Sequence, residues 1–451
     1  MLDSSPYFSG FKPFGYQQKA LDLLYHHDYS LYTPEILLSG SVGSAKSILC
    51  AHWAISHCLR WSGARIAISR LSLPDLRKTI YTEIIEHLDA NFVEGVHYKT
   101  RSNTCDIVFA NGSEIMAVSF GDKRFSKVRS LKLSGIIMEE ATDFPDDFFE
   151  EGGGFMQFKA RLRRIHNVPE NFLLLATNPG DPSSFLYRYF IDGKDKYDSR
   201  YVFYSVTTDN PFLDPIYIKQ LRQDYSFLEA ERYLRGKWIS LIGKGIYHAF
   251  SEKNIHKKDY KVDPDYPIYL SFDFNIGHKK PLSSIMYQYI GKIFHFFAES
   301  IIEGAYTYEG VDDFFNRGLI DTEHHYIIQG DATGRARDPS SLHTNYDVIE
   351  EFLTRRRVRY EIDVPRSNPP IRTRHSKVNA QCCNDAGQVR VFFYKKCPTA
   401  IDGMKLTVLK KGANFIEDDS KSYQHVTTAI GYAICATLES TTQKKQGTVF
   451  L

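Results

Sequence analysis

Cysteine is sparse in this sequence, and the cysteines that are present follow no metal-binding or disulfide pattern. The seven cysteines are scattered from Cys50 to Cys435, and none of them stands in a Cys-x-x-Cys pair. A zinc site or a disulfide framework needs paired cysteines at regular spacing, so neither is expected. Scattered, unpaired cysteines are typical of a reducing compartment, and we therefore expect an intracellular protein.

Long apolar runs and a dominant charge are also missing. No uninterrupted hydrophobic stretch of the sequence approaches the roughly 20 residues of a membrane-spanning helix. The first residues lack the basic and apolar regions of a secretory signal. We therefore expect a soluble, cytoplasmic protein with no membrane partner. The formal net charge of +2 indicates no particular partner for the chain as a whole.

What the sequence does contain is a globular composition, with 43% hydrophobic and 24% charged residues over 451 positions. A chain of that length suggests two domains. Short apolar segments alternate with helical stretches up to residue 180, and the same alternation starts again at residue 269. Continuous apolar segments of this kind are typical of buried strands in a mostly parallel sheet. We therefore expect α/β folds in both halves.

A phosphate-binding loop follows the apolar segment Glu35–Leu38 and precedes a helical stretch. The loop is close to the P-loop pattern GxxxxGK[ST], with Ala45 where the second glycine usually stands. Because alanine adds only a methyl group, we expect the loop to be retained. Lys46 would reach the β- and γ-phosphates of ATP, and the Ser47 hydroxyl would bind Mg²⁺. The predicted nucleotide-binding loop comprises Gly40, Ser41, Val42, Gly43, Ser44, Ala45, Lys46 and Ser47.

Three further segments complete the predicted nucleotide site. The apolar strand Gly135–Met138 ends in two acids, of which Glu139 would hold Mg²⁺ and Glu140 would polarise the attacking water as the catalytic base. A third apolar strand ends in Thr177 and Asn178, which are candidate coupling residues that sense the γ-phosphate. Upstream, the amide of Gln17 is a candidate for pairing with the adenine edge. An ordinary turn explains either of these last two segments equally well.

Together these motifs resemble the large terminase subunit of tailed bacteriophages, over residues 11 to 432. The resemblance is carried by Met138-Glu139-Glu140-Ala141, by Thr177-Asn178-Pro179, by Gln17 or Gln18, and by the segment Tyr233–Trp238. It implies ATP-driven packaging of double-stranded DNA into a viral procapsid. It further implies a homo-oligomeric ring in the host cytoplasm at the procapsid portal vertex, with the portal protein and the small terminase subunit as partners.

One charge of the motor is left unassigned by these motifs. Some of these packaging motors carry an arginine inside the P-loop, where this chain has Val42. A neutralising arginine would then come from elsewhere, even from a neighbouring subunit. Arg124 and Arg129, just before the strand with the two glutamates, are the candidate arginine fingers. Surface arginines that contact solvent or DNA are an equal alternative.

Two acids mark the C-terminal half. Asp273 lies in an apolar strand, and Asp331 follows a second one. The resemblance implies an RNase H-like nuclease, in which such acids converge on one sheet edge and bridge two divalent cations. Oxygen ligands favour Mg²⁺, with Mn²⁺ as the alternative. Asp273 and Asp331 are therefore both candidate catalytic residues and candidate metal ligands.

A third acid is implied on the last helix, within a His-x-x-Asp-Ala pattern, but Thr428 stands at its position in this chain. Either His425 acts as a further metal ligand, or Asp418 or Asp419 substitutes for the missing acid, or the nuclease is weakened. The stretch from Lys377 to Val391 is interpreted as a hairpin beside this site. The basic residues upstream are candidate DNA-phosphate contacts or a solvated surface; they are Arg355, Arg356, Arg357, Arg359, Arg366, Arg372, Arg374 and Lys377.

We therefore predict an α/β protein with an N-terminal P-loop (ASCE-type) ATPase domain, built on a mostly parallel sheet, and a C-terminal RNase H-like nuclease domain. The expected boundaries are 1–180 for the ATPase core, 181–261 for ATPase subdomain II and the linker, and 262–451 for the nuclease. Two alternatives stay open: a P-loop helicase or translocase without nuclease activity, and an assembly protein that keeps its P-loop for nucleotide-dependent folding.

Overall fold

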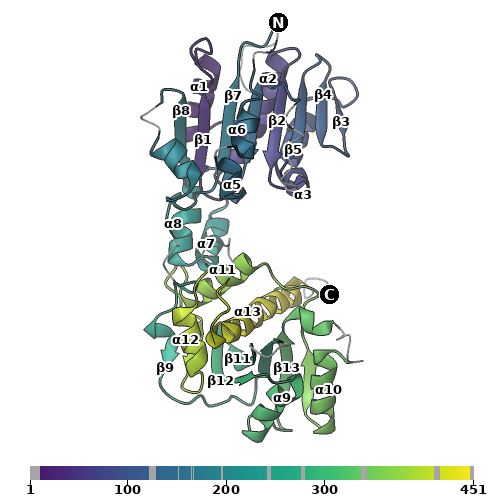
Figure 1. The fold of residues 1–451 in the computed structure, drawn as a ribbon, viewed down its shortest axis with the longest axis vertical. Helices are drawn as coiled ribbons and strands as arrows, with labels where there is room; N and C mark the ends of the chain where they lie inside the picture. Colours follow the sequence, from purple (N-terminus) through teal and green to yellow (C-terminus); the bar gives the residue numbers. More distant parts are fainter. Residues whose placement is uncertain are drawn as a thin grey trace. The chain divides into compact units, whose positions relative to one another are not determined.

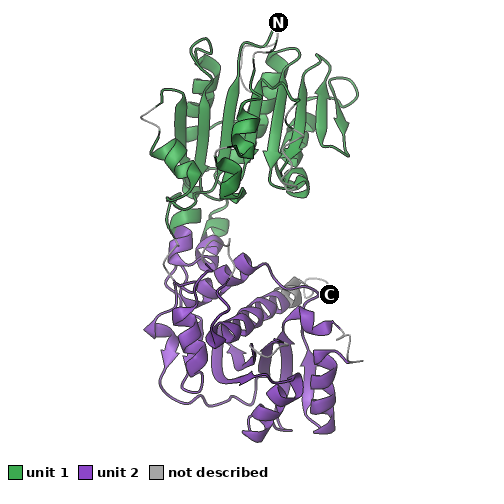
Figure 2. Ribbon diagram, in the orientation of Figure 1, with its two compact units in different colours: residues 1–218, 231–241 green, residues 219–230, 242–451 purple. Residues whose placement is uncertain are grey.

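The computed structural model describes residues 11–120, 128, 130–150, 152–163, 165, 167–193, 197–240, 245–275, 280–336, 343–410 and 417–446. The chain forms two compact units (Figure 2), and each is described by itself. The first unit comprises Met1–Ile218 and Glu231–Leu241, and the second comprises Lys219–Ala230 and Ile242–Leu451. The three-part division at residues 180 and 261 stays a prediction.

The first unit contains an eight-stranded sheet (Figure 1). All neighbouring strands are parallel except the antiparallel pairs β3–β4 and β4–β5. In spatial order the strands are β3 (Tyr98–Arg101), β4 (Asp106–Phe109), β5 (Glu114–Ser119), β2 (Arg65–Arg70), β6 (Gly135–Glu139), β7 (Phe172–Thr177), β1 (Glu35–Gly40) and β8 (Arg200–Ser205). The α-helices are α1 (Gly15–His26), α2 (Lys46–Arg60), α3 (Leu73–Leu76), α4 (Thr82–Asn91), α5 (Asp146–Phe149) and α6 (Gly154–Lys159).

Strands β1, β6 and β7 are buried along their whole length. Their apolar side chains belong to two cores, one on each face of the sheet. Because the three strands are parallel neighbours in the order β6-β7-β1, their carboxyl ends meet at one edge. That edge is where open α/β sheets bind ligands. Helices α7 (Pro215–Asp224) and α8 (Phe227–Tyr233) lie where the chain passes between the two units.

The second unit contains a seven-stranded mixed sheet. Five of its strands run in the order β12-β11-β10-β13-β14, of which β14 lies at the edge of the sheet. Strands β10, β11 and β12 are antiparallel neighbours, and β13 and β14 are parallel to β10. This is the RNase H-like arrangement. The strands are β9 (Ile255–His256), β10 (Ile268–Asp273), β11 (Pro281–Ile290), β12 (Ile293–Glu303), β13 (His325–Gly330), β14 (Arg359–Ile362) and β15 (Val391–Tyr394).

Helices cover both faces of this sheet. Helices α9 (Thr307–Asn316) and α10 (Asn345–Arg355) share one core with β10 and β13. The other core contains β11, β12 and three helices, α11 (Ile371–Cys382), α12 (Pro398–Leu406) and α13 (Ser422–Gln446). Among the described helices, none is long and apolar enough to cross a membrane.

The predicted fold class is confirmed: a mostly parallel P-loop sheet is followed by an RNase H-like unit. The hairpin interpretation of Lys377–Val391 is wrong in its first half, because Lys377 lies within helix α11. That helix buries Val378 and Cys382 in the second core, and this tertiary packing outweighs the local turn signal. The Asp385-Ala386-Gly387 turn is present, with Gly387 at a φ of 76°.

Candidate active sites

The predicted P-loop connects β1 to the first turn of α2. Gly43 and Ala45 both adopt left-handed backbone conformations, with φ values of 75° and 62°. Such a conformation costs a non-glycine residue about 1–2 kcal/mol, so Ala45 keeps the loop shape at a small energetic cost. At Gly40 a side chain is excluded, because an added Cβ would lie 2.1 Å from Ser205 Oγ.

Hydrogen bonds from outside the loop hold its carbonyl groups. Thr207 Oγ1 donates to Val42 O at 2.7 Å, Asn210 Nδ2 donates to Gly43 O at 2.7 Å, and Tyr16 Oη donates to Ser44 O at 2.7 Å. With the carbonyls held outward, the first-turn N–H groups of α2 are available for phosphate oxygens. These three supporting side chains carry no motif, and sequence reasoning missed them.

Lys46 is buried at the base of the loop, with 9% of its surface exposed. Its ammonium donates to Gly40 O at 2.7 Å, to Ser41 O at 2.9 Å and to Asn178 Oδ1 at 3.2 Å. Burial lowers the pKa of Lys46, while the carboxylates of Glu140 and Glu139 oppose that shift. The lysine is thus held in place by acceptors that an anionic phosphate can replace.

The two predicted acids of the motor lie at the end of β6. Glu139 is buried, and its Oε1 has no hydrogen-bond partner among the described residues. A buried carboxylate oxygen without a partner is unfavourable, and it is the kind of ligand that Mg²⁺ takes. Glu140 has a left-handed backbone, with a φ of 46°, and accepts from Asn178 Nδ2 at 3.1 and 3.3 Å. Burial raises the pKa of Glu140, and Lys46 opposes the rise.

Asn178 connects the lysine with the second glutamate. Its amide oxygen accepts from Lys46 and its amide nitrogen donates to Glu140. The preceding Thr177 is fixed by Thr142, whose backbone N–H donates to Thr177 Oγ1 at 3.0 Å. A change in the contacts of Lys46 would therefore reach Glu140 through one amide. The structure brings together Lys46, Glu139, Glu140, Thr177 and Asn178 at one edge of the sheet.

Gln17 uses both ends of its amide within the chain. Its Nε2 donates to Ala45 O at 2.9 Å, and its Oε1 accepts from Phe14 N at 3.3 Å. It also lines a cavity of about 540 Å³ beside the loop, together with Phe14, Ala45 and Phe212. The adenine-reading role of Gln17 stays a prediction. The two candidate arginine fingers, Arg124 and Arg129, lie outside the described residues.

The two predicted nuclease acids lie on neighbouring parallel strands. Asp273 is the last residue of β10 and Asp331 directly follows β13. Phe272 pairs with Gly330 in the sheet, and Asp331 N donates to Phe272 O at 3.0 Å. Both acids are buried, with 5% and 8% of their surfaces exposed. The sheet register therefore brings them to the same edge.

One oxygen of each acid is held by an asparagine. Asn275 Nδ2 donates to Asp273 Oδ2 at 2.9 Å, and Asn368 Nδ2 donates to Asp331 Oδ1 at 2.7 Å. His425 Nδ1 also lies 3.2 Å from Asp273 Oδ2, so only Nε2 of this predicted ligand could face a cation. Asn275 and Asn368 belong to no recognisable motif, so the sequence alone did not indicate that they contact the two acids.

The two acids leave one carboxylate oxygen each for a hydrated cation. In the part of the chain that the structure describes, no hydrogen bond reaches Asp273 Oδ1 or Asp331 Oδ2. Two carboxylate oxygens with water suffice for Mg²⁺ or Mn²⁺. Within the same described ranges, no group of three or more His, Cys, Asp or Glu side chains could hold a metal ion.

Thr428, which stands at the position of the missing acid, forms a hydrogen bond with a different carboxylate. Thr428 Oγ1 donates to Glu417 Oε2 at 3.3 Å, and Arg374 Nη2 donates to Glu417 Oε1 at 2.7 Å. Burial acts to raise the pKa of Glu417, but His375 and Arg374 outweigh it and lower that pKa to about 2. Asp419 is exposed and pairs with Lys280. The buried acid beside Thr428 is thus Glu417, which sequence reasoning did not name.

Two arginines of the predicted basic patch form contacts within the second unit. Arg374 is buried against Glu417. Arg356 lies 3.6 Å from the centre of the Phe352 ring and pairs with Asp312 at 3.1 Å. Intramolecular pairing and burial remove Arg374 from contact with DNA, so that part of the prediction is wrong.

Comparison with known proteins agrees with this geometry. Residues 34–235 match the family model described as phage terminase large subunit. The solved large terminase from a thermophilic bacteriophage aligns with a TM-score of 0.64 and 16% identity, covering 95% of this chain and 100% of that chain. Structures of that terminase with ATP-γ-S and with ADP give TM-scores of 0.63 and 0.64 at 15% identity, each covering 94% of this chain and 100% of that chain.

Among curated proteins, no relative matches the sequence. At 15–16% identity the solved structures show a shared fold. The family match covers the first unit's sheet from the strand before the P-loop to Arg235. Residues 34–235 of this chain therefore match the model of the phage terminase large subunit family, and the chain as a whole shares the fold of the solved large terminase.

Proposed function

We propose that this protein is an ATPase motor that packages double-stranded DNA into a viral procapsid and cuts that DNA with a metal-dependent nuclease. The observation that carries the motor half is the cluster at the edge of the first sheet. There Asn178 joins the buried Lys46 to Glu140, and among the described residues the buried Glu139 keeps one oxygen without a hydrogen bond. The solved terminase with ATP-γ-S supports ATP as the nucleotide.

In the proposed hydrolysis the phosphates lie over the N-terminus of α2, where backbone N–H groups and the helix dipole favour anions. Lys46 exchanges its carbonyl acceptors for the β- and γ-phosphates. Ser47 and Glu139 would hold Mg²⁺, and the bound ion would neutralise charge on the phosphates. Glu140 accepts the proton of the attacking water, and its raised pKa suits a general base. Asn178 then senses loss of the γ-phosphate.

For the nuclease half, the free oxygens of Asp273 and Asp331 would hold Mg²⁺ or Mn²⁺ at the edge of the second sheet. When bound, such a cation polarises the scissile phosphate and lowers the pKa of a bound water. The two acids would fix the position of the cation, because each comes directly after one of two residues that pair between adjacent strands. Cleavage of concatemeric DNA by this site would generate genome ends.

The partners follow from the family and are proposed on that basis. They are double-stranded DNA, the portal protein and the small terminase subunit. The motor would act as a homo-oligomeric ring docked on the procapsid portal vertex in the host cytoplasm. An arginine supplied by a neighbouring subunit would complete each ATP site.

A translocase without nuclease activity is the second candidate. It is favoured by Thr428, which stands where the resemblance implies an acid and which bonds to Glu417. The two candidates differ in one observable, the cleavage of plasmid DNA by the purified protein in the presence of Mn²⁺. Cleavage that depends on Asp331 supports the nuclease, and its absence supports the translocase.

The test of the motor is Glu140→Gln, which removes the base and keeps the shape. ATP binding should stay intact while turnover falls by about 10²–10⁴-fold. Glu150→Gln, a change at an exposed glutamate of the same unit, is the matched control and should keep normal turnover. Turnover near the wild-type rate in the Glu140→Gln protein would disprove the assignment.

A further inference from the structure

We propose that Asn275 and Asn368 are positioning residues of the nuclease site. Each holds one oxygen of an acid, and the other oxygen of that acid is thereby turned toward a shared divalent cation. The inference rests on the proposed nuclease function and adds two residues to it. Neither asparagine would touch the cation itself.

Asn275 has more acceptors around its amide nitrogen than it has hydrogens. Nδ2 lies 2.9 Å from Asp273 Oδ2, 3.0 Å from Pro281 O and 3.0 Å from His425 Nδ1. The carboxylate and the carbonyl can only accept, so they take the two hydrogens. His425 Nδ1 then carries its own hydrogen and donates to Asp273 Oδ2. Asn275 thus fixes both the carboxylate and the histidine tautomer.

Asn368 lies in the loop between β14 and α11 and forms hydrogen bonds with two consecutive residues, Asp331 and Ala332. Its Nδ2 donates to Asp331 Oδ1 at 2.7 Å, and its Oδ1 accepts from Ala332 N at 2.9 Å. The backbone N–H of Thr333 adds a second donor to the same carboxylate oxygen at 2.7 Å. Because one end of the amide must donate and the other must accept, an asparagine fits here and an aspartate would repel Asp331.

The two arrangements are alike although they come from different parts of the unit. Each acid has one oxygen saturated by donors, and the described residues leave Asp273 Oδ1 and Asp331 Oδ2 without a hydrogen bond. The acids follow paired residues of parallel strands, so the two free oxygens belong to one sheet edge. Hydrogen bonds of this kind orient carboxylate ligands, and losing one typically weakens metal affinity or activity about 10–100-fold.

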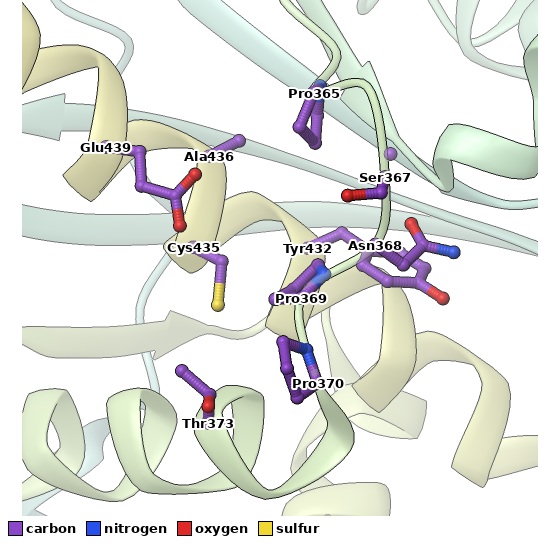
Figure 3. Close-up of a pocket in the computed structure, with 11 residues that line it drawn as sticks. Pro365, Ser367, Asn368, Pro369, Pro370, Thr373, Tyr432, Cys435, Ala436 and Glu439 are labelled. Atoms are coloured by element: carbon purple, nitrogen blue, oxygen red, sulfur yellow. The ribbon is translucent and has the colours of Figure 1, made fainter. Parts of the chain in front are cut away.

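A cavity next to Asn368 makes this residue suitable for mutation. Asn368 and Tyr432 line a cavity of about 200 Å³ together with Pro365, Ser367 and Cys435 (Figure 3). Truncating Asn368 would enlarge a space that already has polar walls, and water can occupy such a space. The fold should therefore tolerate the change, while Asp331 loses a donor.

The experiment measures Mn²⁺ binding to the full chain by electron paramagnetic resonance, without nucleotide, beside Mn²⁺-dependent plasmid nicking and ATPase activity. Asp331→Ala defines which bound Mn²⁺ belongs to this site. Asn275→Ala and Asn368→Ala should each raise the Kd for that Mn²⁺ about 10–100-fold and raise the Mn²⁺ concentration for half-maximal nicking, with ATPase activity unchanged. Asn368→Asp should weaken binding at least as much as Asn368→Ala.

The matched control is Asn254→Ala in the same unit. Asn254 is buried and donates to Cys382 O and Val391 O, so its loss destabilises the unit without changing an acid. If it weakens Mn²⁺ binding as much as the two test variants do, the positioning role is overturned. Unchanged Mn²⁺ binding in both test variants, with a wild type that binds and nicks, also overturns it and leaves the nuclease intact. A wild type that neither binds Mn²⁺ at Asp331 nor nicks DNA overturns the nuclease itself.

Discussion

The ATPase site and the nuclease site differ in how far apart along the chain their predicted ligand-binding residues lie. In the P-loop, Lys46 donates to carbonyls 5 and 6 residues earlier. In the nuclease site, Asp331 is held by a residue 37 positions away and Asp273 contacts a histidine 152 positions away. The phosphate loop is one contiguous segment, although Thr207 and Asn210 support it from 165 and 167 positions away. Asp273 and Asp331, in contrast, come to one edge only through the pairing of their strands. A site formed by one chain segment is visible in the sequence as a motif, whereas a site formed by distant residues is visible only as isolated residues.

The largest expected effect is the loss of nuclease activity without loss of ATPase activity. Asp273→Ala removes a carboxylate from the second sheet edge, so nicking should fall by about 10³-fold, which corresponds to about 4 kcal/mol of lost cation and transition-state stabilisation. ATP turnover should be unchanged, because none of the contacts of Lys46, Glu139 or Glu140 involves Asp273. Plasmid nicking and phosphate release measured on the same preparation check both halves. A parallel loss of ATPase activity would contradict the independence of the sites.

The next largest effect concerns Glu417, the buried acid beside Thr428. Its pKa is lowered to about 2, from an ordinary value of about 4.3. A lowered folded-state pKa gives stability that is present above pH 4.3 and is lost as the pH falls toward 2. Glu417→Gln leaves Arg374 buried without a charged partner, and it should cost about 3 kcal/mol of unfolding free energy at pH 7.

Denaturant titration of both proteins between pH 7 and pH 2.5 checks this effect, since the difference should shrink as the pH falls. Glu439→Gln is the matched control, because Glu439 pairs with Lys377 at the surface of the same unit. Its cost should stay below about 1 kcal/mol. A difference for Glu417→Gln that is independent of pH would show that the carboxylate is not the source of the stability.

These contrasts explain how much could be predicted from the sequence. The order of apolar strands and the spacing from Gly40 to Ser47 predicted the α/β class and the phosphate loop, because both depend on local pattern. The RNase H-like fold of the second unit was implied by the family resemblance. The missing acid at Thr428 was implied by the family resemblance and not by local pattern, and His425, Asp418 or Asp419 was offered in its place. Glu417 was missed because only the folded chain brings it to Arg374, 43 residues away. The burial of Arg374 likewise depends on tertiary packing, which cannot be predicted from the number of charged residues in a segment.

A smaller effect is expected at Tyr16, which ties α1 to the P-loop. Tyr16→Phe removes the hydrogen bond to Ser44 O and leaves a buried carbonyl without that donor. The cost is about 1 kcal/mol, and the ATP-γ-S Kd should rise up to about tenfold because the loop is less well held. Tyr29→Phe, which removes a bond to Leu24 O away from the loop, should keep the wild-type Kd. Calorimetric titration with ATP-γ-S and Mg²⁺ checks both, and equal Kd values for the two variants would contradict the role of Tyr16.

The smallest effect tests the one departure from the P-loop pattern. Ala45 has a φ of 62°, a conformation that glycine adopts without strain, so Ala45→Gly should stabilise the folded loop. The gain is partly offset because glycine also gives the unfolded chain more freedom, and a net gain of about 0.5–1 kcal/mol remains. Ala90→Gly provides the opposite case, since Ala90 is an exposed residue in the last turn of helix α4 and the same change there should cost up to about 0.5 kcal/mol. Denaturant titration of the full chain, read at the transition that bound ATP-γ-S shifts, measures the pair. Two shifts of the same sign would mean that the left-handed backbone at Ala45 stores no strain, and the alanine would then be as good a P-loop residue as the glycine it replaces.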